Sequence, residues 1–170
     1  GRSDSFVPVD TEAVEAPWRE AFRAWVAAQG LDAIISTDGD ADRPLMADEA
    51  GRLVPGDVLG ALTAQALRAE VVATTVSANT CVDLMGGFSV RRTKIGSPYV
   101  IAAMEEAAGA RVVGYEPNGG FLLGFAAQGP TGPLAPLMTR DCLLPLLAPL
   151  AAARARGLSL SGLVATLPAR

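Results

Sequence analysis

The sequence predicts an α/β fold: a mixed, mostly parallel sheet flanked by helices. Apolar runs of strand length alternate with helical segments from residue 70 to 116, which is the pattern of βαβ units. Half of the 170 residues are apolar, enough for the core of one ordinary domain or slightly more. Ligands usually bind at the carboxyl ends of parallel strands, so three polar loops, residues 37–43, 92–97 and 115–120, are candidate sites.

The first part of the chain predicts a helix followed by short strands. A strand-like stretch, residues 6–9, opens the chain, which begins without Met and reads as cut from a longer protein. A helix is then expected to end at Gly30, and its apolar stripe is formed by Trp18, Phe22, Trp25 and Val26. "LDAIIS" has strand length, and "PLMADEAGRLV" predicts two short strands around a turn at residues 49–51.

The remainder predicts alternating strands and helices. The strands are "EVVATTV", "FSVRRT", "RVVGYE" and "FLLGFA", and a short last helix covers residues 159–167. The Pro- and Gly-rich stretch 128–136 is expected to be a rigid connector. Four polar residues are expected to cap helices: Asp57, Asn79, Ser97 (followed by Pro98) and Thr139.

Composition excludes several classes of function. The net charge of −4 argues against general nucleic-acid binding, which needs a basic face. No apolar run is long enough to span a bilayer. We therefore expect a cytoplasmic protein that has neither a nucleic-acid partner nor a membrane partner. The chain has no histidine, which excludes Ser-His-Asp and Cys-His catalysis within it and removes the commonest zinc ligand. Cys81 and Cys142 lie in apolar surroundings and are expected to be reduced core thiols.

The loop "STDGDADRP" places three carboxylates, Asp38, Asp40 and Asp42, on alternate positions. Carboxylates this close repel one another unless a cation lies between them, and their hard oxygen atoms suit Mg²⁺, Ca²⁺ or Mn²⁺ rather than zinc. The alternative is that they cap or turn the chain. An EF-hand is excluded because the sixth position, which needs glycine, is Arg43.

Arg43 follows the carboxylates directly. A guanidinium binds phosphate oxygens through two donors while a divalent ion neutralises another oxygen. Together they are typical of a phosphoryl-transfer site. The alternative for Arg43 is a salt bridge to a neighbouring aspartate.

The other two loops carry a basic cluster and a single acid. Arg91, Arg92 and Lys94 precede Gly96, and Lys94 could reach a hydroxyl or phosphate, although a solvated strand edge would look the same. In "GYEPNGGF", Glu116 ends a buried strand and precedes a Gly-rich turn. A carboxylate there can accept hydrogen bonds from two neighbouring sugar hydroxyls, although a plain turn would also carry such a residue.

These three loops together resemble the α-D-phosphohexomutase superfamily, which includes phosphomannomutase and phosphoglucomutase. "DGDADR" resembles the family's metal-binding loop and is the most specific of the three. "GYEPNGGF" resembles its sugar-binding loop, usually Gly-Glu-x-Ser-Gly-His, and "RRTKIGSPYV" resembles the segment between them. The resemblance extends from about Phe6 to Leu167. It implies that residues 1–50 are the later part of the second of four domains and residues 51–170 the third.

The resemblance also implies a mechanism. A phosphoserine in the first domain gives its phosphoryl group to a hexose 1- or 6-phosphate of mannose or glucose, and takes the other phosphate back. Asp38, Asp40 and Asp42 would hold Mg²⁺, and Arg43 would steady the phosphoserine. Glu116, helped by Asn118, would bind the sugar hydroxyls. Lys94 would act as a general acid or base, which requires a suitable pKa.

Two departures qualify these implications. Asn118 and Gly120 stand where Ser and His are usual, which leaves the hexose open. The sequence contains no Thr-Ala-Ser-His-Asn-Pro type phosphoserine loop and no phosphate-binding loop of the last domain, so domains 1 and 4 are expected as missing partners and the chain alone as inactive. The alternatives are a non-catalytic module that binds Mg²⁺ and sugar phosphate, and a structural α/β domain with acidic turns.

Overall fold

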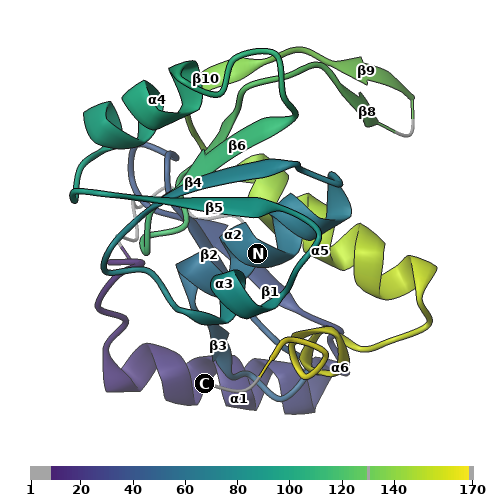
Figure 1. Ribbon diagram of the computed structural model, residues 1–170. Helices are drawn as coiled ribbons and strands as arrows, with labels where there is room; N and C mark the ends of the chain where they lie inside the picture. The colour runs from purple at the N-terminus through teal and green to yellow at the C-terminus, as the bar shows by residue number, and fades with distance from the viewer. Residues whose placement is uncertain (1–8, 130, 169–170) are drawn as a thin grey trace.

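The computed structural model describes residues 9–129 and 131–168, and of the strand expected at 6–9 only Val9 lies among them. Its main sheet has five strands in the order β10-β7-β6-β4-β5 (Figure 1). The pairings β4–β5 and β4–β6 are parallel, whereas β6–β7 and β7–β10 are antiparallel. The mixed α/β sheet flanked by helices is therefore confirmed. The strands are β4 Val71–Thr75, β5 Ser89–Thr93, β6 Val112–Tyr115, β7 Phe121–Leu123 and β10 Leu137–Asp141.

Helices cover both faces of this sheet (Figure 1). Alternate residues of a strand point to opposite faces: Val72 packs with the helix α2, Gly56–Ala66, whereas Ala73 packs with α4, Ser97–Glu105. On the α2 face, the buried Tyr115 ring stacks on Phe121. The short helix α3, Cys81–Leu84, joins β4 to β5. This pattern explains why four consecutive residues of β4, Val72 to Thr75, are all buried.

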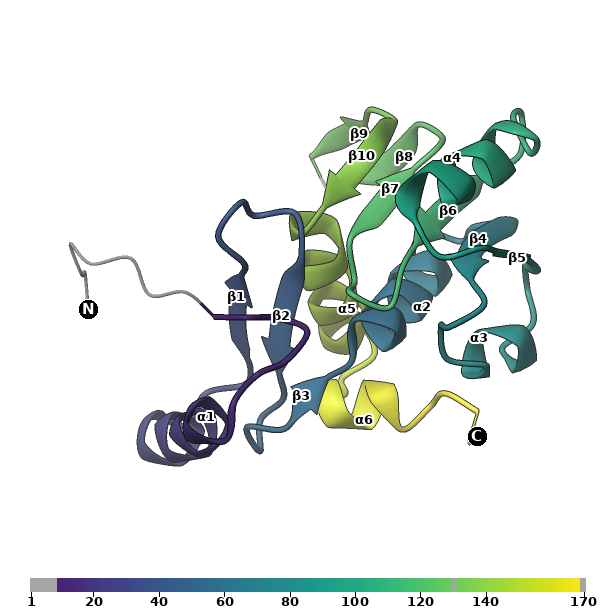
Figure 2. The same cartoon turned by 90° about the vertical axis from the view of Figure 1, so that its left-hand side faces the viewer.

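A second, smaller sheet precedes the main one. It contains β1 Ile34–Thr37, β2 Pro44–Ala47 and β3 Leu53–Val54, all antiparallel. The helix α1, Ala16–Gln29, packs on it through Phe22, which clusters with Leu45 and Ala47 of β2, and Figure 2 shows this helix and sheet at one side of the molecule. Gly30 ends α1 with a φ of 61°, a left-handed conformation that glycine adopts without strain. The helix, its glycine stop and the strands around residues 49–51 are confirmed.

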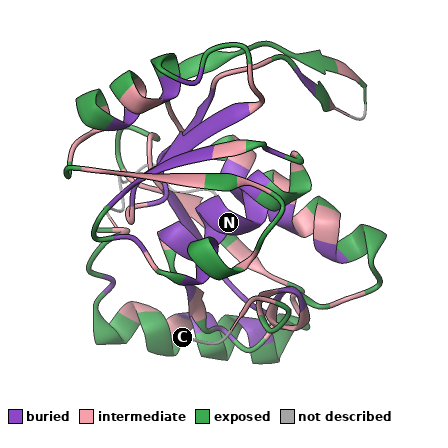
Figure 3. Ribbon diagram, viewed as in Figure 1, coloured by how far each residue is buried: buried purple, intermediate pink, exposed green. Residues whose placement is uncertain are grey.

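The helix α2 packs between the two sheets, with Ala61 and Ala64 in the cluster of the main sheet and Leu59 and Leu62 in that of the small sheet. Met46 and Val54 of the small sheet pack with Leu59 and Leu62 of α2. The helices α5, Leu143–Ala155, and α6, Leu160–Val164, close this cluster. Buried segments therefore run continuously from the small sheet through α2 to the main sheet (Figure 3). The loop between β1 and β2 is thus held against the main sheet by packing that extends well beyond the loop itself.

Two of the expected helix caps, at Asp57 and Ser97, are corrected. Pro55, not Asp57, occupies the cap of α2, and the Asp57 carboxylate instead accepts a hydrogen bond from the Asn79 amide at 2.8 Å. Gly96 precedes α4, and Ser97 is its first residue. The interactions of both polar side chains lie across loops rather than at their own helix, so local sequence does not reveal them.

The segment before α5 is also corrected. Thr139 does not begin a helix but lies within β10, and Asp141 accepts the amides of Leu143 and Leu144 at 3.0 and 2.9 Å. The expected connector at 128–136 contains a hairpin of β8, Ala127–Gly129, and β9, Gly132–Leu134. Thr80 directly precedes α3, although the Asn79 side chain does accept the Cys81 amide at 2.9 Å. The short last helix is present, and Ser159 caps it by accepting the Gly162 amide.

Both cysteines are buried, as expected of core thiols. Within residues 9–129 and 131–168, no helix combines the length and apolar composition that crossing a bilayer requires.

Candidate functional site

The β1–β2 loop and the turn after β6 meet at glycines. A Cβ atom placed on Gly119 would lie 2.6 Å from Cγ of Pro44, and one placed on Gly56 would lie 2.5 Å from the Pro117 carbonyl oxygen. Both distances are shorter than any side chain tolerates. The start of α2 therefore packs against the backbone of the Gly-rich turn, and that turn packs against the ring of Pro44 at the end of the aspartate loop, which explains these two glycines.

Glu116 joins the turn to the loop before α4. Its Oε1 accepts the Gly96 amide at 3.1 Å, and its Oε2 accepts the Ser97 hydroxyl at 2.6 Å. The residue is only 6% exposed, so its charge is stabilised by these donors rather than by bulk water. Two of the loops predicted from the sequence thus lie side by side, and Glu116 is built into the contact between them.

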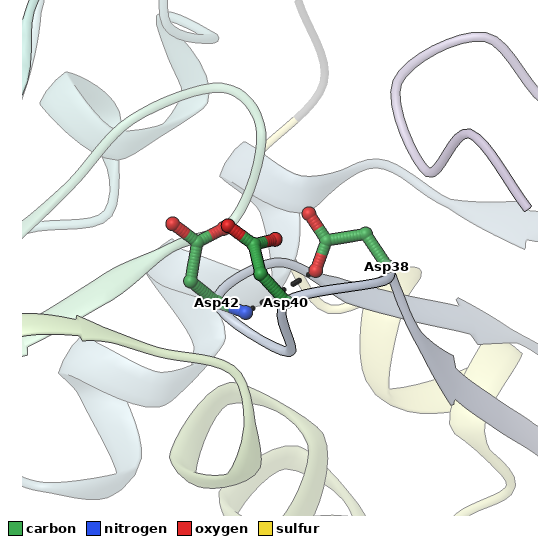
Figure 4. A group of neighbouring side chains, drawn as sticks. All are labelled: Asp38, Asp40 and Asp42. Carbon is green, nitrogen blue, oxygen red and sulfur yellow. Dashed lines mark hydrogen bonds between the residues drawn. The ribbon is translucent and has the colours of Figure 1, made fainter. Parts of the chain in front are cut away.

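The aspartate loop brings its three carboxylates together. One oxygen from each of Asp38, Asp40 and Asp42 lies within 4.8 Å of the others, and Figure 4 shows the side chains on one side of the loop. Asp38 also closes the loop, because its Oδ1 accepts the amides of Asp42 and Arg43, both at 3.2 Å. The prediction that this spacing makes the side chains converge is therefore met by the geometry.

The environment of Asp42 fits a divalent cation. Its Oδ1 is buried and has no hydrogen-bond partner among the described residues, a costly state for a carboxylate oxygen. Burial raises the pKa of Asp42, as do Asp40 and Asp38, against the lowering effect of Arg140 and Arg43. A cation would relieve both the unmet oxygen and the repulsion, and three carboxylates suit Mg²⁺.

Arg43 lies beside the three carboxylates and forms an ion pair with Glu12, which precedes it in the sequence. Its Nη1 bonds Glu12 Oε2 at 2.6 Å, and its Nε is 3.6 Å from Asp38 Oδ2 and 3.5 Å from Asp42 Oδ1. The salt-bridge alternative for this residue is thus realised. The side chain is still 32% exposed, and a guanidinium has five donors, so part of it remains accessible to an anion.

The basic cluster separates into structural and exposed members. Arg92 donates to the carbonyls of Thr75, Ala78 and Asn79 and to Asp83, which fixes the loop after β4. Arg91 pairs with Glu106 on the α4 side. Lys94 is exposed, with Nζ 5.6 Å from the centroid of the Tyr99 ring. Of the three, Lys94 is the one next to the loop whose Gly96 amide bonds Glu116, and it is exposed.

Asn118 is used locally. Its side-chain oxygen accepts the Gly120 amide at 3.0 Å and so stabilises the turn. The Nδ2 group takes no part in that bond, and the residue is half-buried. The turn alternative and the predicted binding role therefore concern different atoms of the same side chain.

Comparison with known proteins decides the family. The family model for phosphoglucomutase/phosphomannomutase, alpha/beta/alpha domain III, matches residues 55–170. The chain belongs to this family. It is 48% identical over 172 residues to a phosphomannomutase of Salmonella muenchen, covering 99% of the chain and 36% of that protein. It is 46% identical over 170 residues to a phosphomannomutase of Sinorhizobium fredii, covering 97% of the chain and 35% of that protein.

The chain thus spans about a third of the length of these curated relatives. Among solved structures, a putative phosphomannomutase of Thermus thermophilus aligns with a TM-score of 0.66 at 20% identity, covering 90% of this chain and 35% of that one. At this identity the likeness supports the fold. The recognition of an α-D-phosphohexomutase fragment with a domain 3 fold is confirmed.

One residue beside the site escaped sequence analysis of this phosphohexomutase chain. Arg140 of β10 forms an ion pair with Asp42. A helix start at Thr139 would place Arg140 on a helix, whereas both residues lie in β10. The signal that was available is Asp141, a better helix cap than Thr139, which would have left "LMTRD" as a strand.

Proposed function

We propose that the chain is part of a phosphohexomutase of the phosphomannomutase/phosphoglucomutase type, which moves a phosphoryl group between O1 and O6 of a hexose phosphate through an enzyme phosphoserine. The observation that carries the proposal is the convergence of the Asp38, Asp40 and Asp42 carboxylates on a loop packed directly against the turn that carries Glu116. Residues 1–50 would end the second domain of the parent protein, and residues 51–170 would form the third.

In this proposal the three aspartates hold Mg²⁺. When bound, the ion supplies charge neutralisation for the phosphoryl group. Arg43 steadies the same phosphate with its accessible donors. Its pairing with Glu12 fixes the guanidinium in place, so little side-chain entropy is lost when an anion arrives.

The sugar lies against Glu116 and Asn118. Both Glu116 oxygens already accept one protein donor each, and each retains a lone pair for a sugar hydroxyl. The protein donors orient the carboxylate before the sugar binds, which favours binding. Lys94, exposed on the neighbouring loop, is placed to give or take a proton at the hydroxyl that exchanges phosphate.

The phosphoserine and the distal phosphate site would come from the rest of the parent protein. Without a nucleophile, covalent phosphoryl transfer has no first step. The 170-residue chain should therefore bind ligands weakly and turn over none.

The test is ³¹P NMR of mannose 1-phosphate and glucose 1-phosphate with Mg²⁺, using the full-length parent, its Asp40→Asn variant and the isolated chain. We expect the 6-phosphate to form with the parent only. No turnover by a folded, metal-loaded parent would favour the non-catalytic module that binds Mg²⁺ and sugar phosphate. Turnover by the isolated chain would contradict the assignment of the missing domains.

A further inference from the structure

Arg140 connects the two loops of the candidate site. It lies on β10 of the main sheet and forms an ion pair with Oδ2 of Asp42, which lies on the loop of the small sheet. The Asp42 and Arg140 side chains are 19% and 29% exposed, so the pair is largely shielded from solvent. Shielding makes the pair less sensitive to screening by salt than a surface ion pair.

The stem of Arg140 lies over Gly120. A Cβ atom on Gly120 would be 2.8 Å from Cδ of Arg140 and 3.1 Å from its Cγ. Gly120 has no left-handed φ, so the backbone does not require glycine there. The absence of a side chain instead leaves the space through which Arg140 reaches the aspartate loop.

The contact divides the two oxygens of Asp42. Oδ2 is occupied by Arg140, whereas Oδ1 is the buried oxygen without a hydrogen-bond partner among the described residues. The Nε of Arg43 is 3.5 Å from Oδ1, too far for a good hydrogen bond. Asp42 is therefore arranged to give one oxygen, not two, to a cation.

We propose that Arg140 is a positioning residue that keeps Asp42 a one-oxygen ligand and thereby selects Mg²⁺ over Ca²⁺ at the aspartate loop. Mg²⁺ requires six ligands in near-ideal octahedral geometry, whereas Ca²⁺ accepts six to eight and often takes both oxygens of a carboxylate. Holding Oδ2 denies Ca²⁺ that second oxygen. This inference rests on the proposed metal site.

The test compares the two cations, because the charge of Arg140 repels both equally. Removing the guanidinium changes the attraction for any divalent ion by a similar amount, and this change cancels in the ratio of the Mg²⁺ and Ca²⁺ dissociation constants. We expect Arg140→Met to shift the ratio about tenfold toward Ca²⁺, the scale of outer-sphere partners of metal ligands. Arg140→Lys, which keeps the charge and a donor group but lacks the planar fork of the guanidinium, should restore part of the selectivity.

Two further variants separate position from charge and from general damage. Gly120→Ala keeps Arg140 but pushes its stem away from Gly120, so it should shift the ratio in the same direction. Arg91→Met removes an ion-paired strand arginine of the same sheet, away from the loop, and should leave the ratio unchanged. Titration calorimetry of the chain with each ion, with the melting temperature of each variant recorded, gives the values.

The outcomes are distinct. Wild-type chain that binds neither ion at millimolar concentrations would overturn the proposed metal site and this inference with it. Wild-type chain that binds metal, with ratios for Arg140→Met and Gly120→Ala within about twofold of its own, would overturn the role of Arg140 and leave the metal site standing.

Discussion

At the scale of single residues, the side chains proposed for chemistry also hold the fold. Asp38 closes its loop by accepting two backbone amides, and Glu116 joins two loops. The sequence indicated that Glu116 ends a buried strand, but its donors lie 19 and 20 residues earlier. A pattern read along the chain does not show such contacts, so the burial of Glu116 to 6% exposure was not predictable.

The double role of Glu116 gives the first prediction at this scale. Glu116→Ala leaves the Gly96 amide and Ser97 hydroxyl without their partner, and we expect the free energy of unfolding to fall by about 1–3 kcal/mol. Glu116→Gln keeps an acceptor for Gly96 and a donor for Ser97, so it should be the more stable variant. Urea unfolding of both variants measures this difference.

The same pair tests the sugar contact in the full-length parent. Glutamine accepts fewer hydroxyl protons and carries no charge. If Glu116 makes both sugar bonds, Glu116→Gln should lower kcat/KM by a factor that corresponds to a loss of about 2–4 kcal/mol of transition-state binding. Near-native stability with a strongly lowered kcat/KM supports sugar binding. Unchanged kinetics for Glu116→Gln would leave Glu116 as a structural link alone.

At the scale of elements, types were more predictable than ends. The amphipathic stripe of α1 and the glycine after it were enough to place that helix, because both signals are local. The caps at Asp57, Ser97 and Thr139 were wrong, since each polar side chain or its neighbour interacts with another element. Arg140 was not predicted because the start of α5 was expected after Thr139, whereas the helix begins after Cys142, three residues later, and Arg140 belongs to β10.

The contact between Glu49 and the helix α6 predicts a pH dependence of stability. Glu49, in the turn between β2 and β3, accepts hydrogen bonds from the Ser161 hydroxyl and amide at the start of α6. Burial would raise the pKa of Glu49, but hydrogen bonds from Ser161 and Ser159 outweigh it and lower that pKa to about 2. The lowered pKa means that the folded state favours the charged carboxylate.

The stability that Glu49 contributes is therefore complete above its ordinary pKa of 4.5 and is lost as the pH falls toward 2. We expect the wild-type free energy of unfolding to drop across this window by up to about 3 kcal/mol more than that of Glu49→Gln. Glu20→Gln, an exposed change on α1, is the matched control and should follow the wild type. Parallel pH profiles for wild type and Glu49→Gln would show that the link adds nothing.

At the scale of the whole molecule, the order of elements and the three loops were predictable, and the meeting of the loops was only partly so. The rule that ligands bind at the carboxyl ends of parallel strands applies to the loops after β5 and β6. The aspartate loop instead joins two antiparallel strands of the smaller sheet. It reaches the other loops because the small sheet packs on α2, which in turn packs on the main sheet, and packing of this kind is decided by the chain as a whole.

The central claim is that Asp38, Asp40 and Asp42 form one divalent-cation site. Asp40 is the exposed member, with no hydrogen bond that closes the loop among the described residues, so Asp40→Asn removes a ligand with little damage to the loop. Mn²⁺, which takes similar oxygen ligands, serves as the probe. Its affinity should be weak, because Mg²⁺-type ions keep their waters and the phosphate ligand is missing.

The most direct measurement is the electron paramagnetic resonance signal of free Mn²⁺ during titration of the chain. We predict one bound Mn²⁺ per wild-type chain and displacement of Mn²⁺ by excess Mg²⁺. Asp40→Asn should lose at least the roughly tenfold affinity that loss of an outer-sphere partner costs, because Asp40 is itself a proposed ligand. Glu20→Gln should bind as the wild type does. No Mn²⁺ bound by the folded wild-type chain at millimolar concentration, or equal binding by Asp40→Asn, would contradict the account.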